Sequence, residues 1–156
     1  MKKKAIIIGV SALLIYLLMS SKSFSAPTKS NKIRQCDPFG CGAFGASRGV
    51  RKHEGEDYAI DPGEKVLSPI SGTVTRIAYP YASDLSYKGV EIKNADYTVK
   101  IFYMLATAKI GSTVKAGDVI GTAQDIAKKY GPAMVNHIHV EIRNKAGKLI
   151  QPSTLF

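Results

Sequence analysis

The chain has 156 residues, 45% of them hydrophobic and 22% charged, with a formal net charge of +10. A chain of this length is expected to form one domain with an N-terminal appendage. Four lysines precede residue 26, and removing them leaves a charge of +6 on the rest of the chain. No lysine- and arginine-rich run with interleaved aromatic residues follows, so we expect no nucleic-acid partner. The mild basic excess suits an anionic polymer surface, or simply a solvated face.

The chain begins with the features of an export signal. Three lysines at positions 2–4 precede an apolar stretch from Ala5 to Met19. This stretch is long for a signal sequence but shorter than the roughly 20 residues of a membrane-spanning helix. The small residues around Phe24 favour cleavage after Ser25, with retention as a short membrane anchor as the alternative. We therefore expect residues 1–25 to place the protein outside the cytoplasm, either secreted or in the periplasm or cell envelope, with no other membrane contact.

The polar residues 26–34 are predicted to form a linker, so the predicted domain spans residues 35–156. Near its start, Cys36 and Cys41 lie in the segment C-D-P-F-G-C-G. In an exported protein this spacing predicts a disulfide that closes a small loop. Half of a zinc site is the alternative, but the histidines already supply a complete metal site, which favours the disulfide.

Short β-type runs separated by glycine, proline and asparagine occupy the rest of the chain. Asn94-Ala95-Asp96 is predicted to connect two of these runs as a hairpin, and residues 123–130 are predicted to hold a short helix. Strands are predicted within residues 73–78, 90–93, 99–104, 114–121, 135–143 and 149–150. Strands at this spacing predict a mostly β domain with an antiparallel sheet.

All three histidines of the chain lie in motifs with the spacing of metal ligands. His53 and Asp57 form H-x-x-x-D, and His137 and His139 form H-x-H. Residues two apart on a strand share a face, so we expect His137, His139 and Glu141 to point away from the core. Zinc in a catalytic site takes three protein ligands of these types and keeps one position open. The motifs together predict one zinc site with a spare histidine for proton transfer, although H-x-H alone also occurs on ordinary exposed strands.

Four segments give the chain a specific resemblance. The segments H-E-G-E-D, S-P-I-S-G-T-V, V-K-A-G-D-V-I-G and N-H-I-H-V-E-I resemble those of the lysostaphin-type zinc endopeptidases of peptidoglycan, from about His53 to the chain end. The resemblance implies a mostly antiparallel β fold, Zn²⁺ bound by His53, Asp57 and His139, and His137 as a catalytic residue that activates or orients water. Iron or manganese suits the same ligand types, and zinc is preferred because of the resemblance.

The segment C-D-P-F-G-C-G makes the pattern similar to the branch of leukocyte cell-derived chemotaxin 2, whose members are regarded as binding proteins. Active members of the family carry a second catalytic histidine in a Y-x-H-L-like segment. Here the matching stretch is I-F-Y-M-L, with Met104 at the position of that histidine. A thioether neither transfers a proton nor donates a hydrogen bond.

The sequence therefore predicts an exported zinc-binding protein with weak or absent peptidase activity. The expected partner is peptidoglycan or another anionic cell-surface polymer, or else a protein. The alternative is an active zinc-dependent endopeptidase that hydrolyses peptide cross-links, with His137 assisting the attack of water and the Tyr103 hydroxyl replacing part of the missing function.

Overall fold

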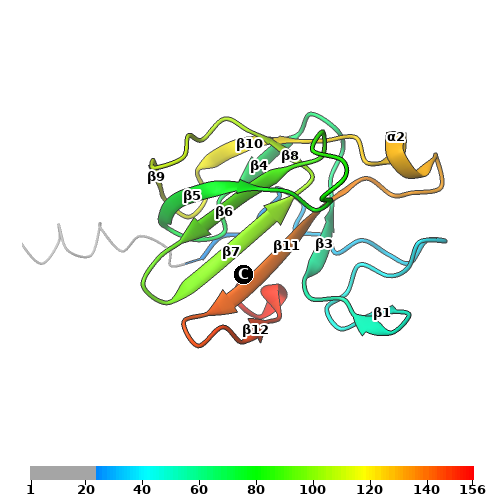
Figure 1. Cartoon of the computed structure of the whole chain (residues 1–156), viewed down its shortest axis with the longest axis horizontal. Coiled ribbons are helices and arrows are strands. Elements are labelled where there is room, and N and C mark those ends of the chain that lie inside the picture. Colours follow the sequence, from blue (N-terminus) through cyan, green and yellow to red (C-terminus); the bar gives the residue numbers. More distant parts are fainter. Residues whose placement is uncertain (1–23) are drawn as a thin grey trace, which may run out of the picture.

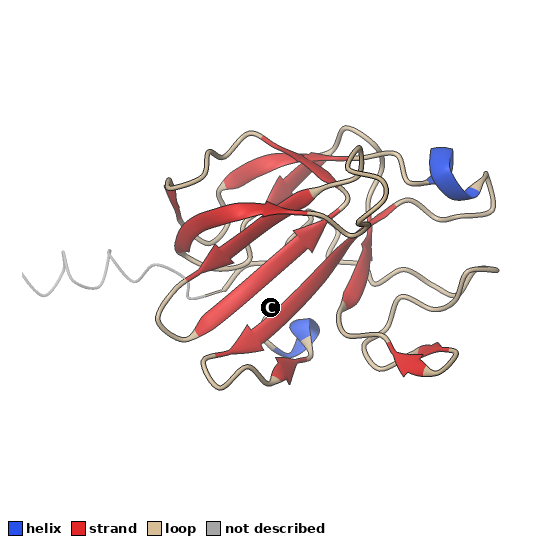
Figure 2. Cartoon of the chain, viewed as in Figure 1, coloured by secondary structure: helices blue, strands red, loops and turns tan. Residues whose placement is uncertain are grey.

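The computed structural model describes residues 24–156, and nearly all of their regular structure is β (Figures 1 and 2). The strands are β1 (Ser47–Arg48), β2 (Arg51–Lys52), β3 (Glu56–Ala59), β4 (Lys65–Leu67), β5 (Gly72–Ala78), β6 (Gly89–Lys93), β7 (Tyr97–Phe102), β8 (Met104–Ala106), β9 (Thr113–Val114), β10 (Val119–Ala123), β11 (His137–Asn144) and β12 (Leu149–Ile150). The helical elements are α2 (Ala127–Tyr130) and the 3₁₀ turn η1 (Pro152–Thr154). The predicted mostly β fold is confirmed.

The predicted signal segment lies outside the described residues, except for its last two positions. Within residues 24–156, no helix is long and apolar enough to cross a membrane.

The main sheet has seven antiparallel strands in the order β12-β11-β7-β6-β5-β9, and β3 pairs with β11 beside that path. A second sheet, β4-β10-β8, packs against it, and β1 and β2 form a separate hairpin (Figure 1). Fully buried side chains from both sheets, such as Val66 and Ile120 from the small sheet and Ile92 and Ile138 from the main one, form one core. This core fixes the position of β11, which carries the H-x-H motif.

Two local predictions are confirmed by the main sheet. Along β11, Ile138, Val140 and Ile142 are fully buried, as the alternating pattern predicts. Between β6 and β7, the Asn94 side-chain oxygen accepts hydrogen bonds from the backbone N–H groups of Asp96 and Tyr97. This side chain closes the turn in the way that makes asparagine common there. Of the short helix predicted within residues 123–130, only the single turn α2 is formed.

Residues 24–34 lie along the domain and hydrogen-bond to it. The N–H groups of Leu67 and Ala59 donate to the carbonyls of Pro27 and Lys32, both at 2.9 Å. The Arg34 N–H donates to the Asp57 carbonyl at 2.7 Å, so β3 lies between this segment and β11. These contacts pair backbone N–H and C=O groups at the edge of β3, and they do not depend on which side chains the segment carries. The polar composition of residues 26–34 therefore does not predict them.

Candidate metal centre

Asp57 and His139 come together through the register of two paired strands. In the antiparallel ladder between β3 and β11, Asp57 is directly opposite His139. Directly opposed residues project to the same face of a sheet. The Asp57 Oδ1 atom therefore lies 3.0 Å from His139 Nδ1. Because His137 is two residues earlier on β11, it also faces this side.

His53 completes the cluster from the segment between β2 and β3. Its Nε2 atom lies 3.2 Å from Asp57 Oδ1 and 3.0 Å from His139 Nδ1. Gly55 makes this approach possible, because a Cβ there would lie 2.3 Å from the Val140 carbonyl oxygen and 2.7 Å from His139 Nε2. Any other residue at position 55 would push the His53 segment away from β11.

His53 Nε2, Asp57 Oδ1 and His139 Nδ1 lie at the distances from one another that the ligands of one metal ion would have. Ligands about 2.0–2.1 Å from a tetrahedral ion lie roughly 3.3 Å from each other, close to the 3.0 and 3.2 Å spacings found here. His53 Nδ1 lies 2.9 Å from the Ala43 carbonyl oxygen. A carbonyl only accepts, so Nδ1 carries the proton and the Nε2 lone pair points into the cluster. The arrangement supports a metal site with His53, Asp57 and His139 as ligands.

His137 lies beside the cluster without belonging to it. Its Nε2 atom is 3.8 Å from Asp57 Oδ1, and its Nδ1–H donates to the Val135 carbonyl at 2.7 Å. Burial lowers the pKa of His137 and outweighs the neighbouring Asp57 carboxylate, which acts in the opposite direction. A neutral imidazole with its free Nε2 lone pair directed at the cluster is suited to accept a proton.

Asp57 is buried, but its surroundings favour the ionised form. Burial opposes ionisation, but the contacts with the neighbouring imidazoles, foremost the hydrogen bond with His139, outweigh it and hold the Asp57 pKa well below its usual value. On the opposite oxygen, Oδ2, the guanidinium of Arg34 donates from Nε at 3.3 Å and from Nη2 at 2.9 Å. Asp57 is thus prepared as an anionic ligand.

Met104 does not face this cluster. Its side chain is fully buried in the hydrophobic core and does not line the pocket around the histidines. The reason is the left-handed backbone of Tyr103, with φ of 64°, which interrupts the alternation between β7 and β8. Tyr103 is therefore the residue that faces His137, with ring centroids 5.4 Å apart. A non-glycine residue in this conformation costs free energy that the surrounding structure must offset.

The Tyr103 hydroxyl belongs to a chain of tyrosines. It lies 3.0 Å from the hydroxyl of Tyr81, which is 2.7 Å from that of Tyr130 on α2. Burial raises the pKa of Tyr103 to about 12, so this hydroxyl stays protonated at neutral pH. It can therefore donate a hydrogen bond to a negatively charged oxygen.

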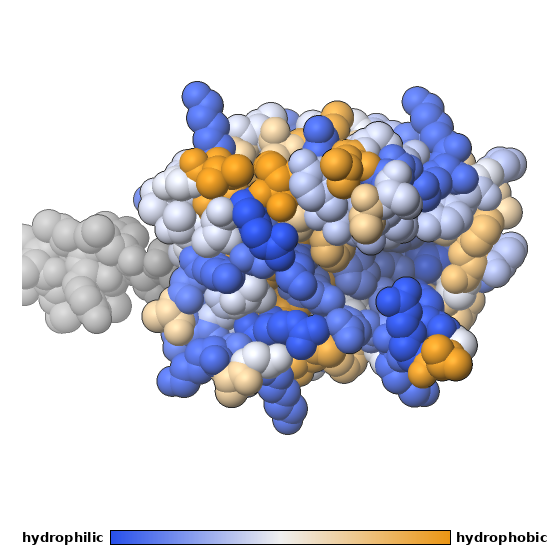
Figure 3. Space-filling view, in the orientation of Figure 1, coloured by the Kyte–Doolittle hydropathy of each residue, from blue (hydrophilic) through white to orange (hydrophobic). Residues whose placement is uncertain are grey.

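A pocket of about 450 Å³ opens over the cluster. Its lining includes Arg48, Arg51 and Lys52 from the β1–β2 hairpin, Tyr81 from the loop between β5 and β6, and Tyr130 from α2. Figure 3 shows hydrophilic side chains gathered over the hairpin and a hollow between the hairpin and α2. The pocket thus combines a cationic wall and an aromatic wall around the candidate metal ligands.

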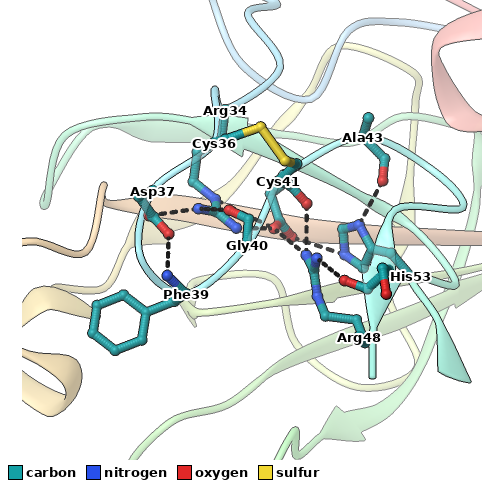
Figure 4. Close-up of a disulfide and its surroundings, with 11 residues drawn as sticks. Arg34, Cys36, Asp37, Phe39, Gly40, Cys41, Ala43, Arg48 and His53 are labelled. Atoms are coloured by element: carbon teal, nitrogen blue, oxygen red, sulfur yellow. Dashed lines mark hydrogen bonds and ion pairs between the residues drawn. A yellow bond between two sulfur atoms is a disulfide. The ribbon is translucent and has the colours of Figure 1, made fainter. Parts of the chain in front are cut away.

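The Cys36–Cys41 disulfide is present and lies close to the cluster (Figure 4). The structure also brings together all four predicted site residues, His53, Asp57, His137 and His139. Arg34 and Arg48 also belong to the site, although nothing in a single sequence distinguishes an arginine that contacts a buried carboxylate from one on the surface.

Comparisons with known proteins identify relatives of the chain and of its fold. Residues 51–152 match the model of peptidase family M23. Leukocyte cell-derived chemotaxin-2 of Mus musculus is 34% identical over 117 residues, which are 74% of this chain and 76% of that protein.

Among solved structures, the antimicrobial peptidase lysostaphin from Staphylococcus simulans superposes with a TM-score of 0.61 at 17% identity, covering 86% of this chain and 53% of that one. A zinc-containing peptidase from Vibrio cholerae gives a TM-score of 0.61 at 24% identity, covering 85% of this chain and 40% of that one. These likenesses show the fold, and the family match over residues 51–152 shows that the chain belongs to peptidase family M23.

Proposed function

We propose that this chain is an exported zinc-binding protein that binds peptidoglycan through the pocket and hydrolyses its peptides slowly or not at all. The observation that carries the proposal is the composition of the pocket. Three candidate ligands converge in it, and His137 is the one imidazole left over, because the chain has three histidines in total. The site thus has the parts for metal binding and one group for proton transfer.

The donor set of two imidazoles and one carboxylate suits zinc. Bound zinc would polarise a peptide carbonyl and lower the pKa of a water molecule. His137 Nε2 then accepts the proton of the attacking water and returns it to the departing amine. The second histidine expected from active relatives is absent, and Tyr103 occupies the wall beside His137. Loss of one such group typically reduces the rate by about 10²–10⁴-fold.

Recognition is assigned to the two walls of the pocket. Arg51 and Lys52 are exposed on the hairpin and are suited to the carboxylates of a peptide or of another anionic cell-surface polymer. The tyrosines present flat apolar surface with hydroxyl groups, which suits the backbone of a peptide or the face of a sugar. The proposed export segment would bring the protein to such a polymer.

Co-sedimentation with purified, insoluble peptidoglycan tests this proposal, with free amino groups measured in parallel. We expect the zinc-loaded protein to sediment with the polymer and to release amino groups at least about 100-fold more slowly than lysostaphin. A protein that stays in the supernatant at low salt would contradict the proposal.

The second candidate function is an active endopeptidase. The observation in its favour is the protonated Tyr103 hydroxyl in the pocket, held by Tyr81 at 3.0 Å. This hydroxyl would donate to the oxyanion that forms when water attacks the peptide carbonyl. Chelator-sensitive amino-group release at a rate comparable with that of lysostaphin would establish this function in place of the first.

A further inference from the structure

The residues of the candidate metal centre are hydrogen-bonded to residues 34–48, a segment that precedes the region matching peptidase family M23. The ligands and His137 all lie within residues 51–152, the region that matches peptidase family M23. Most of the polar groups that hold them in place belong instead to residues 34–48, which include the disulfide loop (Figure 4). This segment therefore supplies support that the matched region does not contain.

The two carboxylate oxygens of Asp57 have separate partners. Oδ1 faces the histidines, at 3.0 Å from His139 and 3.2 Å from His53. Oδ2 accepts two hydrogen bonds from Arg34 and lies 3.5 Å from Nη2 of Arg48. The planar fork of an arginine fixes both the position and the plane of a carboxylate. Arg34 therefore leaves only Oδ1 free to act as a ligand.

Arg34 is in turn fixed by the disulfide loop. Its side chain is only 2% exposed, and its Nη1 atom donates to Asp37 Oδ2 at 2.5 Å and to the Gly40 carbonyl at 2.9 Å. Asp37 and Gly40 also exchange backbone hydrogen bonds across the loop that Cys36 and Cys41 close. The disulfide thus holds in place the acceptors that orient Arg34.

The same segment contacts the other site residues. The Ala43 carbonyl accepts from His53 Nδ1 at 2.9 Å, and the Gly42 carbonyl accepts from the Asp57 N–H at 2.9 Å. Asp37 Oδ2 also accepts from the N–H of Val135 at 3.2 Å, and the carbonyl of Val135 orients His137. Two candidate ligands and His137 are therefore connected to residues 34–43, the segment that contains the disulfide-closed loop.

We propose that Arg34 is a positioning residue of the metal centre, and that the Cys36–Cys41 loop raises metal affinity by holding Arg34 against Asp57. The inference rests on the metal site of the proposed function. Without the disulfide, Asp37 and Gly40 regain conformational freedom, Arg34 loses fixed acceptors, and the Asp57 carboxylate can rotate. Partners of metal ligands at this distance typically change metal affinity by about 10–100-fold.

The test measures zinc affinity by competition with a chelator, using the full protein and its variants. We expect Arg34→Lys and the double variant Cys36→Ser/Cys41→Ser to bind zinc about 10–100-fold more weakly. The absorption spectrum of bound Co²⁺ should also change in both, because the ligand geometry relaxes. Arg76→Lys is the matched control, since Arg76 makes a two-pronged contact with Glu91 on the sheet, and it should bind zinc as the unchanged protein does.

Circular dichroism of the metal-free proteins verifies that each variant is folded. Should neither Arg34→Lys nor the double cysteine variant fold, the zinc affinity of Asp37→Asn is measured in their place. This variant removes the charge that holds Arg34 and keeps the shape of the loop. Folded variants with zinc affinity within twofold of the unchanged protein would overturn the inference. Failure of the unchanged protein to bind zinc would refute the metal site itself, whereas failure to bind peptidoglycan would refute only the proposed function.

Discussion

Asp57 uses one carboxylate oxygen for His139 and the other for Arg34, with Oδ1 3.0 Å from His139 Nδ1 and Oδ2 2.9 Å from Arg34 Nη2. The pairing of β3 with β11 sets the first contact, and the segment before the hairpin sets the second. Asp57 therefore connects the sheet to the segment that contains the disulfide loop. A metal ion at this point would tie together three parts of the chain that are distant in sequence.

Metal removal is expected to lower thermal stability. A ligand present at about 1,000 times its Kd stabilises the folded state by about 4 kcal/mol. For a chain of this size this corresponds to a shift of roughly 10 °C in the melting temperature. Thermal unfolding of the zinc-loaded protein, with and without a chelator, measures the shift. An unchanged melting temperature would show that the metal does not stabilise the fold.

Variants of Tyr103 are expected to change hydrolysis in opposite directions. Tyr103→Phe removes the hydroxyl that faces the pocket and should reduce any residual amino-group release by about tenfold or more. Tyr103→His places an imidazole beside His137 and should increase the release.

Met104→His provides the control for these variants, because Met104 points into the core. It should destabilise the protein through a buried polar group without increasing hydrolysis. An increase in Met104→His alone would show that position 104, and not position 103, replaces the second catalytic histidine.

Charge reversal on the hairpin should weaken binding to peptidoglycan. Arg51 and Lys52 are exposed and line the pocket, so Arg51→Glu/Lys52→Glu should leave the fold intact and lower the affinity about tenfold at low salt. The difference should shrink at high salt, because exposed charges are screened. Lys109→Glu, at an exposed position outside the pocket, is the control. Equal losses in both variants would indicate a general charge effect without a specific pocket.

A buried carboxylate of the sheet predicts how stability depends on pH. Burial opposes ionisation of Glu91, but Arg76, Thr75 and Lys93 outweigh it and lower its pKa below the usual value of 4.5. A lowered pKa in the folded state stabilises the protein at pH values above the unfolded-state pKa. This contribution is lost as pH falls from about 5 through the folded-state pKa.

Glu91→Gln tests that dependence. Both basic partners of Glu91, Arg76 and Lys93, are about half-exposed, so we expect a loss of only about 1 kcal/mol at pH 7. Denaturant unfolding at several pH values should show the two proteins converging in acid. A difference in the free energy of unfolding that persists in acid would mean that Glu91 acts through packing and not through its charge.

Much of the fold could be predicted because its signals are local. The alternation of apolar residues in β11 and the Asn94 turn depend on neighbouring residues only. The four residues His53, Asp57, His137 and His139 could be assigned to one site because the chain has no other histidine. Residue type and spacing were sufficient for that grouping.

The remaining features depend on contacts between distant residues. Arg34 is recognisable as a site residue only once β3 is placed beside residues 32–34 and β11. The positive φ of Tyr103 reverses the faces predicted by simple alternation, so Met104 enters the core and Tyr103 faces His137. No rule of strand periodicity anticipates such a break at a tyrosine.

The metal site is tested most directly by titrating the purified metal-free protein with Zn²⁺, monitored by calorimetry and compared with Asp57→Asn. We expect one tightly bound zinc ion per chain in the unchanged protein and a loss of affinity of at least about 100-fold in the variant. The absence of stoichiometric zinc binding by the folded, unchanged protein would contradict this expectation.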